Sequence, residues 1–285
     1  MLWAFLSILA GLGDAISFAS IKKLGKLNTH MKLLFYNLIT LPFLLFGFLF
    51  YEIPSASSYF YIVVFINAIV WSIAIFLLMR SLETSDLSVS IPILSFTPIF
   101  LLLVSYILLK EFPSLQGLIG ILIVVAGSYT LNISSIKSGY FEPIKSIFVK
   151  KGFYMLIAAF LFSITASLAK IGINLSNPAY FMFVHYLFTS LILTTLFFNK
   201  INENKKQIKA NFKYFLIIGI SVAFSEILAA TAFTLTIVPY VISLKRINVI
   251  FSVLIGFLLF KEKHFKESIT GSIIMFIGAL LITLS

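Results

Sequence analysis

The chain has 285 residues, of which 60% are apolar or aromatic and only 11% are charged. An ordinary soluble domain is about 45–50% apolar and about 25% charged, whereas the mean hydropathy here is +1.09. This composition excludes a disordered chain, a secreted scaffold and a cytosolic enzyme. The absence of cysteine excludes a disulfide framework and a thiolate metal site, and three scattered histidines do not suggest a metal site either. The sequence predicts an integral membrane protein.

The formal net charge of +11 does not indicate a nucleic-acid-binding protein. Lysine and arginine are mostly confined to short gaps between apolar runs, which is the usual pattern of membrane loops. The sequence contains no long basic helix and no basic-aromatic module. We expect the partners to be a lipid bilayer and a small-molecule substrate.

Apolar stretches that cross a bilayer core of about 30 Å need about 20 residues each. The chain contains about ten such stretches, and the gaps between them leave no room for a soluble domain. The first lacks the basic start and the cleavage site of a signal peptide, so we expect it to be a retained helix. The expected fold is an all-α integral membrane protein with transmembrane helices at 2–21, 31–51, 59–79, 87–109, 114–133, 153–173, 178–198, 214–236, 239–260 and 267–284.

The second half of the chain repeats the first at a spacing of 151 residues. YILLKEFPSLQGLIGILIVVAGSYTL, residues 106–131, aligns with FLLFKEKHFKESITGSIIMFIGALLI, residues 257–282, so that a Lys-Glu pair and two glycines coincide. Each repeat carries about five spans, and because five is odd the halves must cross the membrane in opposite senses. Many secondary transporters have this inverted-repeat plan, with the substrate site near the midplane. We expect a first five-helix repeat at 1–138, a linker at 139–150 and a second repeat at 151–285.

Two further segments carry a family resemblance: SIPILSFTPIFLLLVSYILLKE, residues 90–111, and YVISLKRINVIFSVLIGFLLFKE, residues 240–262. They resemble the fourth helix and the acidic loop of EamA-type transporters, in the drug/metabolite transporter superfamily, and the resemblance covers nearly the whole chain. It implies two five-helix repeats and transport of a small metabolite, without implying which one. We expect the acidic residues Glu111 and Glu262 to anchor a helix end or a loop.

Ionisable side chains inside the expected spans point most directly to a site, because each costs about 2.5–3.5 kcal/mol at the centre of a membrane helix. They are Asp14, His185, Glu226, Lys245 and Arg246. With a rise of about 1.5 Å per residue, Asp14, His185, Glu226 and Lys245 fall at comparable depths. Asp14 and Glu226 are expected either to neutralise Lys245 and Arg246 in a structural ion-pair network or to contact substrate or protons directly. Lys170 lies near a helix end and is interpreted as structural.

Helical faces are consistent with a shared cavity, because small or polar residues recur at spacings of three and four on three spans. The three stripes are Ser7, Ala10, Gly11, Asp14 and Ser17; Gly219, Ala223, Glu226 and Ala230; and Lys245, Asn248, Ser252 and Gly256. We expect further wall residues at Tyr36, Asn37, Asn67, Trp71 and Tyr186. Breaks or kinks of the fourth and ninth spans are expected at Pro92, Pro98 and Pro239.

The segment SLKRINVIFSV, residues 243–253, resembles the Lys-Arg segment of the sugar-phosphate and related organic-anion branch of the superfamily. In that branch such a pair holds the anionic group. The resemblance implies that Lys245 and Arg246 hold a carboxylate or phosphate of the substrate, with Asn248 on the same helical face as Lys245. His185, at similar depth, is a further expected donor.

These observations predict a secondary carrier that works by alternating access on a small metabolite, such as an organic anion or an amino acid. The chain has no Walker loop, so we expect energy from protons or from exchange, with Asp14 and Glu226 as the available protonation sites. No cofactor, metal ion or enzymatic activity is expected. Two alternatives stay open: a flippase for a lipid-linked group, and a membrane-embedded lipid-modifying enzyme, although no catalytic spacing appears.

Two arguments about orientation disagree. Lysine and arginine gather in the odd-numbered gaps, counted from the first, and the positive-inside rule places these gaps in the cytoplasm and both termini outside. The family resemblance implies both termini inside. We follow the charge bias, and expect a multi-pass protein of the cell membrane that is a monomer or a homodimer.

Overall fold

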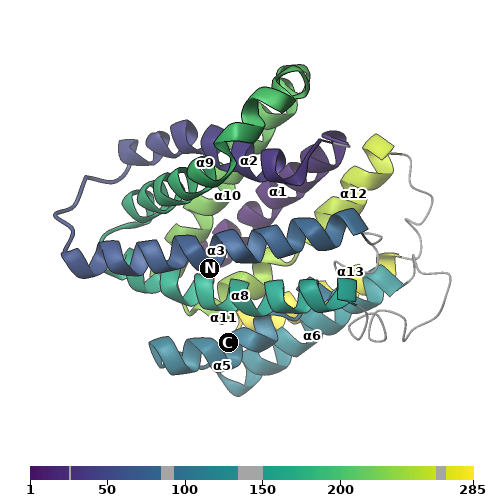
Figure 1. Ribbon diagram of the computed structural model, residues 1–285. Coiled ribbons are helices and arrows are strands. Elements are labelled where there is room, and N and C mark those ends of the chain that lie inside the picture. Colours follow the sequence, from purple (N-terminus) through teal and green to yellow (C-terminus); the bar gives the residue numbers. More distant parts are fainter. Residues whose placement is uncertain (26, 85–92, 134–149, 261–267) are drawn as a thin grey trace.

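The computed structural model describes residues 1–25, 27–84, 93–133, 150–260 and 268–285, and these residues form helices and short connections without a strand (Figure 1). Most of the expected linker therefore lies outside the described residues. The helices are α1 (Leu2–Lys23), α2 (Thr29–Leu44), the 3-10 helix η1 (Leu45–Leu49), α3 (Ser58–Thr84), α5 (Thr97–Leu109), α6 (Leu115–Ile133), α8 (Lys150–Asn174), α9 (Pro178–Ala210), α10 (Phe212–Leu235), α11 (Val238–Lys245), α12 (Asn248–Phe260) and α13 (Ser268–Thr283).

Six of the described helical segments are long and apolar enough to cross a membrane. They are α1, α2 with η1, α3, α8, α9 and α10, while α5, α6 and α13 contribute shorter apolar helices. The all-helical membrane fold is confirmed. The number ten is not confirmed, because the described parts of the fourth and ninth expected spans do not form uninterrupted helices.

Both interruptions fall at equivalent positions of the repeats. Ser95 and Phe96 form a turn immediately before α5, and Arg246 and Ile247 form a turn between α11 and α12. Ser95 and Arg246 are 151 residues apart, the spacing of the internal repeat. Each repeat therefore breaks its fourth helix at the same place.

Pro98 lies just after the first of these breaks, as expected from the sequence, because a proline removes the hydrogen bond to the carbonyl four residues earlier, here that of Leu94. Pro239 does not lie at the second break, which is at Arg246 and Ile247. Pro98 and Pro239 both occupy the first turn of a helix, α5 and α11 respectively. A first-turn residue has no intrahelical partner for its N–H, so proline costs nothing there. Pro92 lies outside the described residues.

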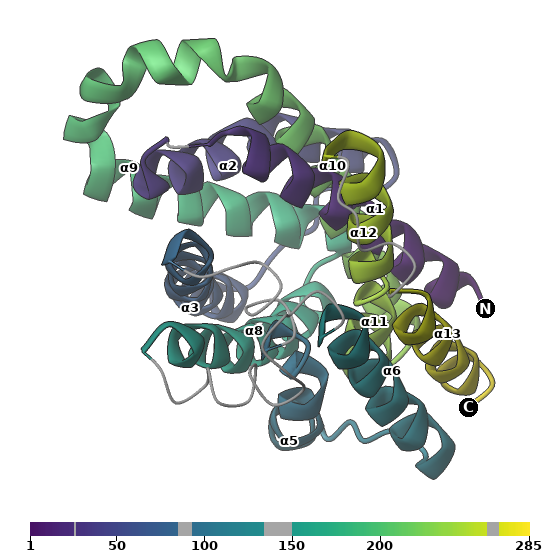
Figure 2. The same ribbon diagram turned by 90° about the vertical axis from the view of Figure 1, so that its right-hand side faces the viewer.

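Helix packing is preserved when the two halves are exchanged. α1 packs against α10, and its counterpart α8 packs against α3; likewise α12 packs on α1 and α5 on α8. The equivalent pairs α2–α9 and α6–α13 also pack against each other, and Figures 1 and 2 show α6 beside α13 in both views. This reciprocal pattern fits two repeats related by a twofold axis.

Close contacts between glycines show the same symmetry. A methyl group added to Gly120 would lie 2.8 Å from the carbonyl oxygen of Gly278, and one added to Gly127 would lie 2.9 Å from that of Gly271. Because Gly271 and Gly278 follow Gly120 and Gly127 by 151 residues, the two contacts are equivalent under exchange of the repeats. Small residues at these positions allow α6 and α13 to approach closely.

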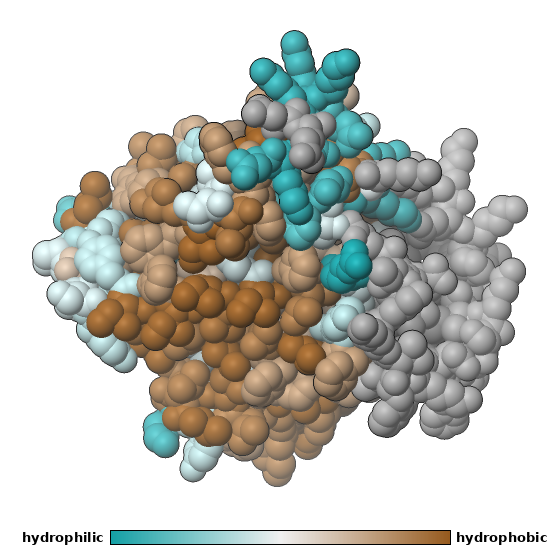
Figure 3. Space-filling model, in the orientation of Figure 1, coloured by the Kyte–Doolittle hydropathy of each residue, from teal (hydrophilic) through white to brown (hydrophobic). Residues whose placement is uncertain are grey.

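The outer surface suits a lipid environment. Large apolar side chains on α3 are exposed, and Figure 3 shows an apolar band across the face that α3 occupies; these side chains are Ile62, Phe65, Ile66, Ile69 and Ile73. Hydrophilic residues gather at the top of that view, over the end of α9, which continues to Ala210, beyond the expected span. Exposed apolar area of this extent is stable only against lipid, so the fold is that of a multi-pass membrane protein.

Candidate functional site

Three ionisable side chains from α1, α10 and α11 meet inside the helix bundle. Lys245 Nζ lies 3.3 Å from Asp14 Oδ2 and 3.2 Å from Glu226 Oε1. The Ser225 hydroxyl donates to Asp14 Oδ1 at 2.5 Å. The side chains of Lys245, Asp14 and Glu226 are 13%, 19% and 24% exposed, so they are largely buried. We refer to Asp14, Glu226 and Lys245 as the charged triad.

Two glycines bring α1 against the other helices of the charged triad. A methyl group on Gly11 would lie 2.8 Å from the carbonyl oxygen of Lys245 and 3.2 Å from the amide nitrogen of Asn248. A methyl group on Gly13 would lie 2.7 Å from the carbonyl oxygen of Ser221 on α10. Any larger residue at these two positions would push α1 away. The small-residue stripe of α1 therefore packs against the interruption between α11 and α12, where Asn248 is buried.

Arg246 lies at the helix interruption and is not part of the charged triad. Its Nε atom is buried without a hydrogen-bond partner in the described chain, and no carboxylate among the described residues forms an ion pair with it. Asp14 is near enough to attract it electrostatically. The sequence suggested a network in which Asp14 and Glu226 neutralise both Lys245 and Arg246. In the structure both carboxylates form ion pairs with Lys245 instead. Adjacent helical residues point about 100° apart, which turns Arg246 away from the face of Lys245.

An aromatic cluster links α2, α3 and α9. The ring of Trp71 lies 6.0 Å from that of Tyr36, 5.7 Å from that of His185 and 6.0 Å from that of Tyr186. Asn67, one turn before Trp71 on α3, is also buried. We call the cluster of Tyr36, Asn67, Trp71, His185 and Tyr186 the aromatic wall.

The aromatic wall lies beside the charged triad. Glu226 and Asp14 are both close enough to act electrostatically on the hydroxyl groups of Tyr36 and Tyr186. The side chains expected on six helices of both repeats thus surround one region of the bundle, with charge on the side of α1, α10 and α11 and with rings on the side of α2, α3 and α9.

Several buried polar atoms of this region have no hydrogen-bond partner within the described chain. Each unpaired buried polar group costs about 1–3 kcal/mol, and such groups in native proteins are usually satisfied by water or a ligand. In this region the unpaired atoms on α2, α3 and α9 include Asn37 Oδ1, Asn67 Oδ1, His185 Nδ1, Thr189 Oγ1 and Ser190 Oγ. The region can therefore accept polar groups from a molecule that enters it.

Thr189 and Ser190 were not identified from the sequence. Hydroxyl groups in membrane helices usually bond to a carbonyl of their own helix, as Ser72 and Thr195 do here. Only the structure shows that these two hydroxyls remain unpaired. The sequence does place Thr189 and Ser190 one helical turn after His185 and Tyr186, on the same faces of α9, and this spacing could have identified them.

His185 packs among aromatic rings. It stacks on Phe181 at 5.9 Å and packs edge-on against Trp71 and Tyr186. Neither Lys245 nor Arg246 is among the contacts that the described structure gives it. His185 therefore belongs to the aromatic wall, and the three residues expected to hold one anion do not converge in this conformation.

A second polar cluster joins the two repeats away from the charged triad. Glu111 accepts a hydrogen bond from the amide of Val238 at 2.9 Å, and its other oxygen lies 2.5 Å from Lys170 Nζ. Lys170 also donates to the carbonyl oxygen of Thr236 at 2.8 Å. This latch, formed by Glu111 and Lys170 with the backbone at Thr236 and Val238, connects the α5–α6 loop to the α10–α11 loop. Glu262, expected in an equivalent role, lies outside the described residues.

Replacement of Glu111 by Ala is expected to destabilise the protein by about 3–5 kcal/mol, because it removes one partner of a largely buried ion pair and leaves an amide unpaired. Thermal unfolding in detergent measures the effect. Glu52→Ala is the matched control, because Glu52 is exposed on another loop of the chain. Equal unfolding temperatures for the Glu111 variant and the wild type would show that the latch contributes nothing to stability.

Comparisons with known proteins agree with this architecture. The model of the EamA-like transporter family matches residues 1–133 and 150–284. Among solved structures, 28 chains match, and one of them, titled "Crystal structure of protein", has a TM-score of 0.72 and 13% sequence identity, covering 99% of this chain and 96% of that chain. At this identity the likeness shows the fold alone. No curated protein matches.

Proposed function

Because this chain belongs to the EamA-like transporter family, in the drug/metabolite transporter superfamily, we propose that it is a secondary carrier that moves a small organic anion across the cell membrane by alternating access. The observation that carries the proposal is the state of Arg246: a guanidinium at a helix interruption, beside the charged triad, with a buried Nε that has no partner in the described chain. A buried N–H group without a hydrogen-bond partner is unfavourable, and an anionic ligand would supply that partner.

The neighbouring side chains suit a metabolite that carries a carboxylate or a phosphate, amino acids included. Arg246 would bind two oxygens of the anionic group in a bidentate arrangement, and Lys245 would bind a third. The unpaired amide and hydroxyl groups of Asn37 and Thr189, on two of the helices that carry the aromatic wall, would bind the neutral polar part of the ligand. Trp71 would cover its apolar part.

The charged triad provides a route for coupling to protons. Lys245 is shared by Asp14 and Glu226 in the absence of a ligand. An anion that engages Lys245 competes with these carboxylates, and a buried carboxylate that loses its cation is most readily neutralised by binding a proton. The anion and the proton would then move together. A carrier that exchanges one anion for another would keep the carboxylates charged.

The latch supports alternating access, because it ties the two repeats together at the even-numbered gaps. Its polar contacts join the fourth gap to the eighth. Opening toward that side requires these contacts to break, while opening toward the odd-numbered gaps does not. The positive-inside rule assigns the odd-numbered gaps to the cytoplasm.

The test begins with purified protein screened by thermal shift against anionic, cationic and neutral metabolites, since a ligand stabilises the state that binds it. Uptake of the best ligand is then measured in proteoliposomes with and without an inward proton gradient. We expect stabilisation by anions only, and faster uptake with the gradient. Stabilisation by cations or neutral amphipathic molecules alone would contradict the anion carrier, and gradient-independent uptake that requires an internal anion would replace proton coupling with exchange.

A further inference from the structure

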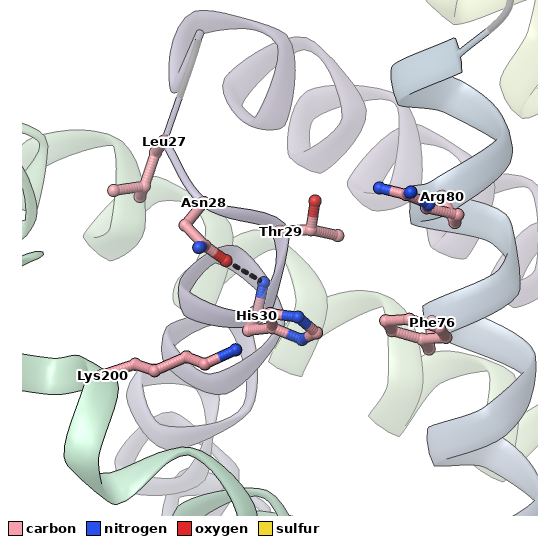
Figure 4. A pocket seen from close by; sticks show the side chains of 7 residues that line it. All are labelled: Leu27, Asn28, Thr29, His30, Phe76, Arg80 and Lys200. Carbon is pink, nitrogen blue, oxygen red and sulfur yellow. Dashed lines mark hydrogen bonds between the residues drawn. The ribbon is translucent and has the colours of Figure 1, made fainter.

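A pocket of about 510 Å³ opens at one end of α2, α3 and α9, away from the charged triad. Its lining includes Asn28, Thr29, His30, Phe76, Arg80 and Lys200 (Figure 4). Thr29 and His30 begin α2, Phe76 and Arg80 lie near the end of α3, and Lys200 lies on the last part of α9. Three helices that are distant in the sequence therefore contribute to one pocket.

The pocket has a basic character. Arg80 and Lys200 contribute positively charged groups from α3 and α9, His30 contributes an imidazole from α2, and none of the described lining residues is acidic. In Figure 4 the side chains of Arg80 and Lys200 extend from opposite sides toward the space around His30. The N-terminus of α2, capped by the Asn28 side chain on the amide of His30 at 2.9 Å, also faces this pocket and adds its partial positive charge. We call His30, Arg80 and Lys200 the basic mouth.

Aromatic contacts hold the basic mouth in place. The His30 ring stacks on Phe76 at 5.6 Å and packs against Phe197 at 4.4 Å. Lys200 Nζ lies 5.8 Å from the centre of the same Phe197 ring, which favours its position through a cation–π interaction. The two basic side chains of α2 and α9 are therefore ordered by one shared ring.

The same three helices lead from the basic mouth to the aromatic wall. Asn37 follows His30 by seven residues on α2, which is about 10 Å along a helix axis. Trp71 precedes Arg80 on α3, and Ser190 precedes Lys200 on α9. The pocket thus lies at the odd-numbered gaps, at the outer ends of the helices that line the proposed substrate region.

We propose that the basic mouth is a second anion-binding site, which binds the carboxylate or phosphate group of a soluble metabolite before it reaches Arg246. The identity of the ligand at this second site rests on the proposed function. Positive charge at the entrance of a low-dielectric cleft concentrates anions locally and increases their rate of entry. The site therefore raises the apparent affinity of transport from the odd-numbered side without taking part in translocation.

Binding to the basic mouth is tested with inorganic phosphate or citrate in the full-length protein in zwitterionic detergent. The Arg246→Gln variant, in which the central site is disabled, should still show a concentration-dependent thermal shift. Adding Arg80→Gln and Lys200→Gln should abolish this shift. The control adds Lys205→Gln and Lys209→Gln to Arg246→Gln instead, which removes the same charge from exposed positions near the end of α9. This control variant should keep the thermal shift. Loss of the entire shift in Arg246→Gln alone would overturn the proposal.

Transport provides the second readout. The Arg80→Gln/Lys200→Gln variant should raise the KM for anion uptake about 3- to 10-fold at low ionic strength, with kcat unchanged, and the difference should shrink when salt shortens the Debye length to about 8 Å. An unchanged KM would contradict a role in entry. The binding assay remains informative even if no uptake is found, so failure of the proposed function and failure of this site are distinguishable.

A lipid headgroup carries the same chemistry as a soluble phosphate, and a nanodisc experiment separates the two sources. In discs of phosphatidylcholine alone, inorganic phosphate should stabilise the wild type more than the Arg80→Gln/Lys200→Gln variant. Stabilisation by added phosphatidylglycerol that depends on Arg80 and Lys200, without an effect of free phosphate, would assign the pocket to a lipid and overturn the proposal.

Discussion

Replacing Arg246 with Gln is expected to lower uptake of the anionic substrate by about 30-fold or more, while the protein stays folded. Removing one partner of a buried, hydrogen-bonded charge pair costs about 2–5 kcal/mol, and Arg246 is the cation that the charged triad leaves without an ion pair in the described chain. Because no carboxylate of the described chain depends on Arg246, its loss leaves no buried charge behind. Initial uptake rates in proteoliposomes at a substrate concentration below KM measure the effect.

Lys213→Gln is the matched control for this variant, because Lys213 is exposed near the start of α10 and its loss changes the net charge equally. Size-exclusion profiles and the unfolding temperature check that both variants are folded. If uptake of every anionic substrate survives in both Arg246→Gln and Lys245→Gln, the two cations are structural. A cationic or amphipathic substrate would then fit better.

Replacing Lys245 with Met is expected to cause a large loss of stability, unlike Arg246→Gln, which should lower uptake while the protein stays folded. Lys245 is the shared partner of Asp14 and Glu226, so its removal leaves two carboxylates largely buried without a cation. Breaking a buried ion pair in this way costs about 3–5 kcal/mol. The intrinsic fluorescence of Trp3 and Trp71 during thermal unfolding in detergent reports the loss.

A second variant separates charge imbalance from lost packing. Lys245→Met combined with Glu226→Gln removes one negative charge as well as the positive one, so it should recover part of the stability lost in the single variant. Lys213→Met serves as the control for the change of side chain. An unfolding temperature of Lys245→Met equal to that of the wild type would show that the ion pairs are not structural.

Sequence reasoning located the residues of the charged triad because a charge in an apolar span is expensive to bury and therefore conspicuous. Counting the rise per residue was enough to place Asp14, Glu226 and Lys245 at comparable depth. It did not determine which carboxylate contacts which cation. That choice depends on how closely α1 approaches α11, and the approach is set by contacts at Gly11 and Gly13 that involve the backbone of other helices.

For the aromatic wall, too, the sequence identified some of the residues but not how they are arranged. Tyr36, Asn67, Trp71 and Tyr186 could be selected because they are polar or amphipathic side chains in apolar helices. The position of His185 could not, since the rotation of α9 decides whether His185 or Tyr186 faces the charged triad. Hydroxyl groups such as that of Thr189 were missed, because an unpaired hydroxyl and one bonded to its own helix look identical in a sequence.

The sequence by itself determined that the protein lies in a membrane, that it is built from two repeats and that it belongs among EamA-like transporters. Hydrophobic length and internal similarity are local properties, and they can be read without knowing any contact. Only the tertiary structure decided that the ninth span breaks at Arg246 rather than at Pro239, that Lys245 takes both carboxylates, and that Glu111 binds Lys170 across the repeats. Each of these depends on distances between helices far apart in the chain, which packing alone establishes.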